Sequence, residues 1–224
     1  SCVATSNLDV ESNMTLDEWY APAYWEPQEA IYLLATTETS VDPSKIMGGG
    51  PTIPIEVQAM LAIALATSVN VRVLVSPTTD EETAFREQLR QLHYVGDNVT
   101  FHNVTHCDIW TRDTGPIWIK QRAGHGVKMI KPIFSLWGYL INASDVDGPW
   151  AKCDVPNFVP DQLQQLFKFG METPEYTSEG GDKSFNGRGS VLMSKRNPHL
   201  TLTEIEDLAK KSLHVSHIVW VGHG

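Results

Sequence analysis

The sequence predicts an α/β fold, and three observations lead to that prediction. Short runs rich in β-branched and aromatic residues alternate along the chain with windows of helical periodicity. Apolar residues make up 42% of the chain, which is enough to fill a packed core rather than leave the chain disordered. The longest apolar run, residues 60–66, is too short to cross a bilayer, so we expect a soluble globular chain without a membrane partner.

The first half of the chain is predicted to alternate between strands and helices. Pro54 lies where the first turn of a helix tolerates a proline. Thr79 and Asp80 are candidate caps for the following helix, because the acidic Glu81 and Glu82 suit the positive end of a helix dipole. The expected elements are strands at residues 30–36, 71–75 and 99–104 and helices at residues 55–68 and 81–92.

The second half of the chain continues the same alternation of strands and helices. Thr203 and Glu206 have the spacing of a capping box that would open the last helix. The expected elements are strands at residues 116–120, 127–134, 191–194 and 215–221 and helices at residues 161–169 and 204–212. The elements therefore form successive small units, each of two or three strands and one helix. No change in composition marks a boundary between domains, so residues 1–224 are expected to belong to one domain.

Charge and glycine usage exclude several classes of partner. The chain has 17 Lys and Arg against 27 Asp and Glu, a net charge of −10, and no basic stripe. This argues against a nucleic acid and mildly favours a cationic partner, although an acidic surface also serves solubility alone. The glycine run at residues 48–50 lacks the lysine of a P-loop and the spacing of a dinucleotide fingerprint, so it does not predict a phosphate site.

The cysteines do not predict a metal site. Cys2, Cys107 and Cys153 cannot all pair within one chain, and none lies in a cluster with zinc spacing. A structural zinc ion is therefore not expected. Cys107 lies beside Asp108 and near Trp110, but we interpret it as a buried apolar residue or a half-cystine rather than a nucleophile.

Four N-x-S/T triplets hint at a secretory route. They begin at Asn13, Asn98, Asn103 and Asn142, and a chain that starts at Ser1 also fits a processed N-terminus. We therefore predict a secreted glycoprotein. The alternative is a cytoplasmic protein in which these triplets are short polar loops that are never glycosylated.

Residues 108–116 form the first segment that is too polar for an ordinary loop. It places Asp108, Asp113, Arg112 and Trp110 within six residues between two extended runs. If the backbone is extended, Asp108, Trp110 and Arg112 face one way and Asp113 faces another. The alternative is a turn held by an ion pair between Arg112 and a carboxylate, with Trp110 in the core.

Residues 179–189 form the second such segment. Gly180 and Gly181 follow Glu179 and let the backbone approach a ligand closely. Asn186 and Gly187 are a strong signal for a tight turn before a strand, so a plain glycine-rich hairpin is the alternative. If the two segments converge, their carboxylates suit a planar guanidinium, which donates forked pairs of hydrogen bonds.

Several motifs resemble one known family. The heptapeptide Trp110-Thr-Arg-Asp-Thr-Gly-Pro116 is similar to the W-x-R-D-x-G-P signature of the agmatine deiminase and bacterial (Porphyromonas-type) peptidylarginine deiminase family. Glu179-Gly-Gly resembles its E-G-G motif. Further similar stretches follow in collinear order over residues 19 to 224, namely Trp25-Glu-Pro-Gln-Glu29, Leu136-Trp-Gly138, Asn186-Gly-x-Gly189 and Arg196-Asn-Pro198.

The resemblance implies a fold, a reaction and site residues. The fold would be the pentein-type α/β propeller, in which five ββαβ units surround a central site and about three belong to this chain. The reaction would convert a guanidinium group to a urea and ammonia without a cofactor, through attack by a cysteine thiolate while a histidine transfers protons. By this match Asp113 and Glu179 clamp the substrate and Trp110 walls the pocket. Arg112 would hold a nearby carboxylate, and Asp108, Gly180 and Gly181 would support the site.

The match ends before the family's catalytic histidine and cysteine. His223 lies in V-G-H-G rather than in the family's G-H-x-D segment, so we interpret it as a loop residue. We therefore expect the chain alone to be an inactive partial domain, and a second polypeptide, most simply a C-terminal remainder, to complete the propeller. The substrate would be agmatine, peptidyl-arginine or another guanidine. The alternatives are a catalytically inactive glycoprotein that binds cationic guanidino ligands and a purely structural α/β domain.

Overall fold

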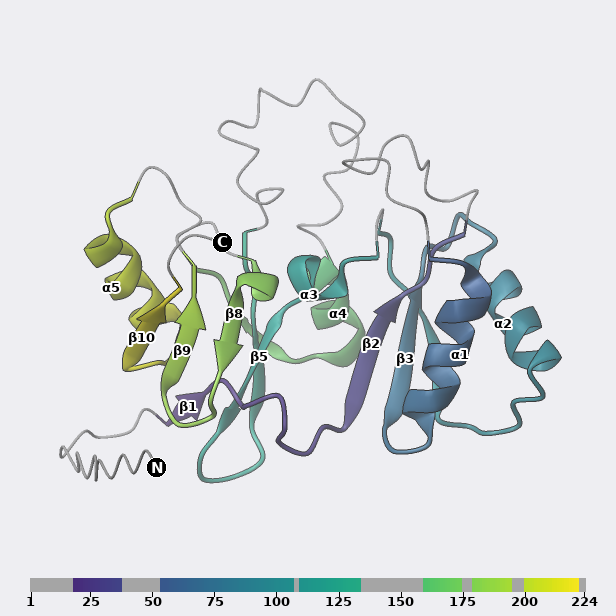
Figure 1. Ribbon diagram of the computed structural model, residues 1–224, viewed down its shortest axis with the longest axis horizontal. Coiled ribbons are helices and arrows are strands. Elements are labelled where there is room, and N and C mark those ends of the chain that lie inside the picture. The colour runs from purple at the N-terminus through teal and green to yellow at the C-terminus, as the bar shows by residue number, and fades with distance from the viewer. Residues whose placement is uncertain are drawn as a thin grey trace, which may run out of the picture.

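The computed structural model describes residues 18–37, 53–106, 109–133, 159–174, 179–194 and 200–221. Within them the chain forms three sheets that lie side by side, with helices packed on them (Figure 1). This mixture of sheets and helices agrees with the predicted α/β class. Each sheet is built mainly from strands that are close in sequence. Each sheet with its helices therefore forms one unit, and the three units follow one another along the chain.

The first unit is entirely parallel. It contains β2 (Ala30–Leu34), α1 (Ile55–Ala66), β3 (Asn70–Val75), α2 (Glu81–Gln91) and β4 (Val99–Asn103), with the sheet order β2-β3-β4. Because parallel neighbours need a crossover connection, this unit has two helices, and the expectation of one helix per unit is wrong here. Both helices contribute to a core that includes Ala59, Ala62, Val73, Phe85 and Leu89.

The second and third units share a different order of two strands, a helix and a strand. The second contains β5 (Ile117–Gln121), β6 (Val127–Ile130), α4 (Val159–Phe167) and β7 (Gly170–Glu172), and β1 (Trp19–Tyr20) pairs with the outer edge of β5. The third contains the 3-10 turn η3 (Gly180–Asp182), β8 (Lys183–Phe185), β9 (Ser190–Met193), α5 (Leu202–Leu213) and β10 (His217–Trp220). In both units the first two strands are antiparallel and the helix connects two parallel strands, which is the ββαβ pattern implied by the family resemblance.

Some predicted boundaries need correction. The capping box of α5 is formed by Thr201 and Glu204, not by Thr203 and Glu206, because the helix begins at Leu202. Asp80 precedes α2 as predicted, but its side chain makes no capping hydrogen bond. The strands β1, β7 and β8 were not foreseen, since runs of two or three residues are too short to show a period. The turn at Asn186 and Gly187 is confirmed, with a φ of 73° at Gly187 between β8 and β9.

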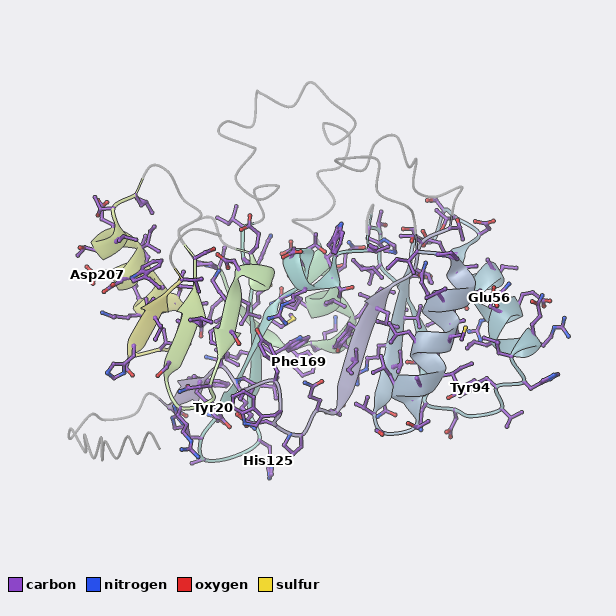
Figure 2. All side chains as sticks on the ribbon, viewed as in Figure 1. Tyr20, Glu56, Tyr94, His125, Phe169 and Asp207 are labelled. Carbon is purple, nitrogen blue, oxygen red and sulfur yellow. The ribbon has the colours of Figure 1, made fainter. Side chains whose placement is uncertain are left out.

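Buried side chains join the units to one another. One cluster that includes Leu34, Met129 and Leu163 connects the first and second units, and Phe169 packs against it (Figure 2). A second cluster that includes Ile119 and Val191 connects the second and third units. The described part of the chain therefore has a core that runs through all three units. None of its helices is long and apolar enough to span a membrane.

A polar contact also joins β7 to the end of α5. Glu172 Oε2 lies 3.0 Å from His214 Nε2, and Lys128 donates to Glu172 Oε1 at 3.2 Å. Burial by itself would raise the pKa of Glu172, but the hydrogen bonds from His214 and Lys128 outweigh it and bring the pKa below its ordinary value of 4.5. The carboxylate is therefore ionised when this contact forms.

Candidate functional site

The segment that carries Asp113 folds as one helical turn, α3 (Thr111–Thr114), and not as a strand. The Asp113 and Thr114 amides both donate to the Trp110 carbonyl at 3.0 Å, and the Thr114 hydroxyl also donates to it at 3.0 Å. Short polar side chains favour such local hydrogen bonds over an extended backbone. The predicted alternation of faces is therefore wrong. Asp113 is 9% exposed and Trp110 is 45% exposed, so Trp110 is not a core residue either.

A hydrogen bond to the first unit anchors α3. The Leu34 amide, at the end of β2, donates to the Thr111 hydroxyl at 3.1 Å. In Figure 1, α3 lies between the ribbons of β8 and β2. The helical turn is thus placed at the carboxyl end of β2 and faces the third unit.

The two acidic motifs meet at this place. The Gly181 amide donates to Asp113 Oδ1 at 3.1 Å, although the two residues are 68 positions apart. A Cβ atom added at Gly181 would overlap Asp113 Oδ1, and one added at Gly180 would overlap the Arg112 carbonyl oxygen. Both glycines are therefore required by the close approach of η3 to α3. Glu179, which immediately precedes η3, is 1% exposed.

Arg112 supports the site through contacts with Tyr24 and with the backbone of Lys183. Its guanidinium donates to the Tyr24 hydroxyl and, at 2.8 Å, to the Lys183 carbonyl. These two contacts of Arg112 among the described residues are with neutral oxygens, and a pairing with the carboxylate of Asp108, which lies outside them, stays a prediction. The Tyr24 hydroxyl donates to the same carbonyl at 2.6 Å, and the guanidinium carbon lies 4.3 Å from the centre of the Tyr24 ring. Burial raises the pKa of Tyr24, and the nearby Arg112 only partly offsets that effect, so the phenol keeps the proton that it donates.

Two residues of this arrangement were missed by sequence reasoning. Tyr24 directly precedes the Trp25 motif, and its position there was the only signal available. Lys183 follows the E-G-G motif and is 2% exposed, and its ammonium donates to the Glu179 carbonyl at 2.8 Å and pairs with Asp182. A lysine is normally assigned to the surface, so its burial could not be predicted from the sequence.

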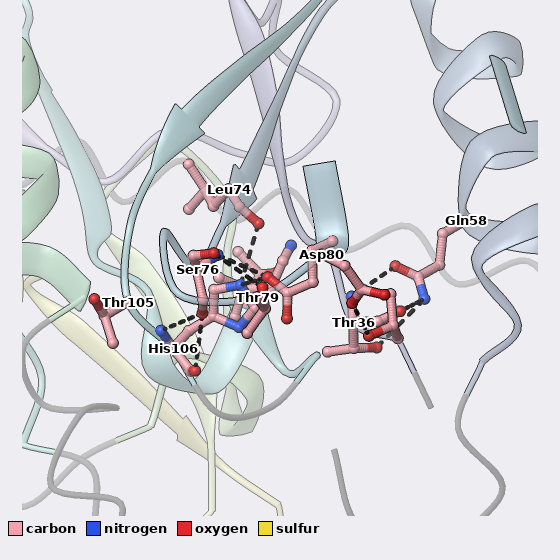
Figure 3. A network of polar contacts seen from close by, with 12 residues as sticks. Thr36, Gln58, Leu74, Ser76, Thr79, Asp80, Thr105 and His106 are labelled. Carbon is pink, nitrogen blue, oxygen red and sulfur yellow. Dashed lines mark hydrogen bonds and ion pairs between the residues drawn. The ribbon is translucent and has the colours of Figure 1, made fainter. Parts of the chain in front are cut away.

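The carboxyl ends of β2 and β3 are held by buried polar side chains (Figure 3). The Gln58 side chain accepts from the Thr36 amide at 3.2 Å and donates to the Thr36 carbonyl at 2.9 Å. The Glu81 carboxylate accepts from the Ser76 amide at 2.7 Å and lies 3.5 Å from His106 Nε2. Since the Leu34 amide at the end of β2 donates a hydrogen bond to Thr111 of α3, these contacts also stabilise the part of β2 to which α3 is anchored.

The remaining predicted residues are distributed as follows. Asn98 donates from Nδ2 to the Ala66 carbonyl at 2.9 Å, and Asn103 is exposed at the end of β4. Whether either is glycosylated stays a prediction. The calls on Asp108, on the three cysteines, on Asn13, Asn142 and His223, and on residues 48–50, 136–138 and 196–198 lie outside the described residues.

The described residues show no metal cluster, and two surface hollows lie elsewhere than at Asp113 and Glu179. No group of three or more His, Cys, Asp or Glu side chains among them could hold a metal ion. A surface hollow of about 250 Å³ lies beside Ser76 and Arg86, and one of about 320 Å³ lies beside Trp25 and Arg188. Neither is lined by Asp113 or Glu179.

Comparisons with known proteins agree with the resemblance seen in the motifs. The family described as Porphyromonas-type peptidyl-arginine deiminase matches residues 20–224. The agmatine deiminase of Pseudomonas putida is 26% identical over 223 residues, covering 96% of this chain and 56% of that protein. The chain thus spans about half the length of the curated relatives it matches.

Solved structures agree as well. The agmatine deiminase of Enterococcus faecalis matches with a TM-score of 0.75 at 24% identity, over 93% of this chain and 54% of that chain. A Campylobacter jejuni agmatine deiminase matches with a TM-score of 0.68 at 20% identity, over 95% of this chain and 59% of that chain. The fold is therefore the pentein-type α/β fold that the motifs implied.

Proposed function

The chain belongs to the Porphyromonas-type peptidyl-arginine deiminase family, and on that premise we propose that it is the guanidinium-binding part of a guanidine deiminase. The observation that carries the proposal is the hydrogen bond from Gly181 to Asp113, which brings the W-x-R-D and E-G-G motifs together. Relatives named agmatine deiminase, at 26% identity, support the same reaction.

In this proposal Asp113 and Glu179 bind the substrate cation. A guanidinium is planar and presents pairs of N–H donors, and a carboxylate accepts such a pair with both oxygens. Both side chains are almost fully buried, so their attraction for a cation is screened little by water. In the proposal Trp110, which is 45% exposed and directly precedes α3, flanks the bound guanidinium.

The chemical steps need a nucleophile and a proton carrier from outside the described residues. A cysteine thiolate attacks the guanidinium carbon and the C–N bond to one nitrogen breaks, so that ammonia leaves once that nitrogen has received a proton. Water then attacks the thiouronium carbon, which forms the urea and returns the thiolate. We propose that a second polypeptide, such as a C-terminal remainder, supplies these groups. The coverage of about half of each relative supports this, as do the exposed apolar residues Leu192 and Val219 on neighbouring strands β9 and β10.

The test is a turnover assay on the complete protein. Agmatine and an arginine-containing peptide are offered separately, and ammonia and the ureido product are measured. We expect turnover of one of them, its loss on thiol alkylation, and its loss in Asp113→Asn. The exposed Asp97→Asn serves as the matched control and should keep full activity. Guanidine binding without release of ammonia would instead support a catalytically inactive binding protein, and absence of both would refute the proposal.

A further inference from the structure

Lys183 is a buried cation directly beside the acidic site. Its side chain is 1% exposed, and that of its ion-pair partner Asp182 is 5% exposed. A lysine ammonium is strongly hydrated, so removing it from water is unfavourable unless a partner compensates the charge. Here the compensating charge is that of Asp182, which belongs to η3, so the ion pair stabilises the conformation of this turn.

The contacts of Lys183 reach both halves of the site. Its ammonium donates to the carbonyl of Glu179 at 2.8 Å, across the whole of η3. Its own carbonyl accepts hydrogen bonds from Arg112, which belongs to α3, and from Tyr24. One residue therefore fixes the backbone of Glu179 on one side and ties α3 to β8 on the other.

The turn η3 needs contacts of this kind to keep one conformation. Glu179 has no side-chain capping bond, and a single 3-10 turn has few internal hydrogen bonds. Gly180 and Gly181 give the turn more backbone freedom than other residues would, and no other residue fits there, because Gly180 packs against the Arg112 carbonyl and Gly181 against Asp113. A turn of this kind holds one conformation only when groups outside its own backbone restrain it.

We propose that Lys183 is a positioning residue for the guanidinium site, acting through its hold on Glu179 and η3. The inference rests on the proposed function for the meaning of the site, but not for the contacts themselves. Lys183 touches no substrate in this scheme. It sets where the Glu179 carboxylate stands relative to Asp113, and it compensates the negative charge of Asp182 within η3.

A pair of variants of the complete protein separates positioning from stability. Lys183→Met keeps the length of the side chain but removes the ammonium, so it leaves Asp182 as a buried carboxylate without its partner. The double variant Asp182→Asn, Lys183→Met removes that charge as well. Breaking a buried ion pair is costly, whereas removing both charges is often tolerated, so the double variant should melt closer to the wild type. Lys210→Met removes an exposed lysine that pairs with Glu206 at 3.3 Å and serves as the control.

The melting temperature of each variant is recorded together with two further quantities: hydrogen exchange of the peptide over residues 179–185 and the affinity for agmatine by calorimetry. We expect faster exchange and about tenfold weaker agmatine binding in both Lys183 variants, because neither restores the hydrogen bond to the Glu179 carbonyl. Lys210→Met should change neither quantity.

Three outcomes decide the matter. Recovery of melting temperature without recovery of exchange protection and affinity supports positioning. Wild-type exchange in Lys183→Met, or recovery of all three quantities in the double variant, overturns it. If the wild-type protein binds no guanidine at all, the proposed function fails, and the exchange rates still decide whether Lys183 holds the turn.

Discussion

Replacement of Gln58 by methionine tests whether buried polar contacts hold the end of β2. The Gln58 side chain lies inside the first unit and connects the start of α1 to Thr36 (Figure 3). It accepts from the Thr36 amide at 3.2 Å, and its Nε2 donates to the Thr36 carbonyl at 2.9 Å and to the Ile53 carbonyl at 2.7 Å. Methionine has nearly the same length and shape but can make none of these bonds.

The expected loss follows from which partners can turn to water. Thr36 is 1% exposed, so its amide and carbonyl lose this partner where water does not reach, at about 1 to 3 kcal/mol each. Ile53 is 42% exposed, so its carbonyl can bind water and contributes little. The apolar methionine returns about 1 kcal/mol through burial of its side chain. The free energy of unfolding should therefore fall by about 1 to 5 kcal/mol, which lowers the melting temperature by about 2 to 20 °C.

The assay is urea unfolding of the complete protein followed by circular dichroism, with the midpoint and slope fitted separately. Gln91→Met, which removes an exposed amide bonded to Glu87 at 2.9 Å, is the matched control and should change the free energy by less than about 0.5 kcal/mol. The reasoning is refuted if Gln58→Met unfolds at the same urea concentration as Gln91→Met.

Three further predictions concern the cap of α5, the contact of β7 and the glycine at the site. Thr201→Ala should lower the free energy of unfolding by about 0.5 to 2 kcal/mol and Thr203→Ala by clearly less, because Thr201 forms the capping box; equal losses in urea unfolding would contradict this. Glu172 has a lowered pKa in the folded state, so its stabilising contribution is present above its unfolded value of about 4.5 and is lost as the pH falls through the lower folded value. The stability difference between wild type and Glu172→Gln, measured by unfolding from about pH 6 to about pH 3, should therefore shrink with acid, and a constant difference would argue against the contact. Gly181→Ala should destabilise the protein by about 1 to 3 kcal/mol and weaken agmatine binding, since the new Cβ displaces Asp113, and unchanged calorimetric affinity would show that the two motifs are not so closely packed.

Elements with a clear period were predictable, and short or tertiary ones were not. The helix α2 and the strands β3 and β4 lie within a residue or two of their predicted ranges, because their apolar spacing reports on a buried face. The helix α1 also lies within two residues of its predicted range, although its apolar residues include the exposed Met60 and Leu61. The turn α3 was missed as a helix because four residues carry no period, and its hydrogen bonds run from the Asp113 and Thr114 amides and the Thr114 hydroxyl to the Trp110 carbonyl.

The candidate site divides in the same way. The sequence marked Asp113, Glu179 and the two glycines after it, since unusual residues in close spacing stand out locally. The contacts of Arg112 with Tyr24 and with the Lys183 carbonyl were not predicted, because a lone arginine does not reveal which of many distant acceptors it meets. The role of Lys183 was invisible for the same reason, as burial of a charge depends on what the rest of the chain packs around it.

By itself the sequence determined the α/β rhythm, the turn at Gly187 and the two acidic motifs, because each depends on the conformational preferences of neighbouring residues. Only the tertiary structure decided that α3 and η3 are in contact and that Arg112 donates to Tyr24 and to the Lys183 carbonyl. It also decided that Lys183 is buried and donates to the Glu179 carbonyl. These contacts join residues that are far apart along the chain. They form only when whole units pack together, and the free energy of that packing comes from many side chains, so no single segment of the sequence reveals it.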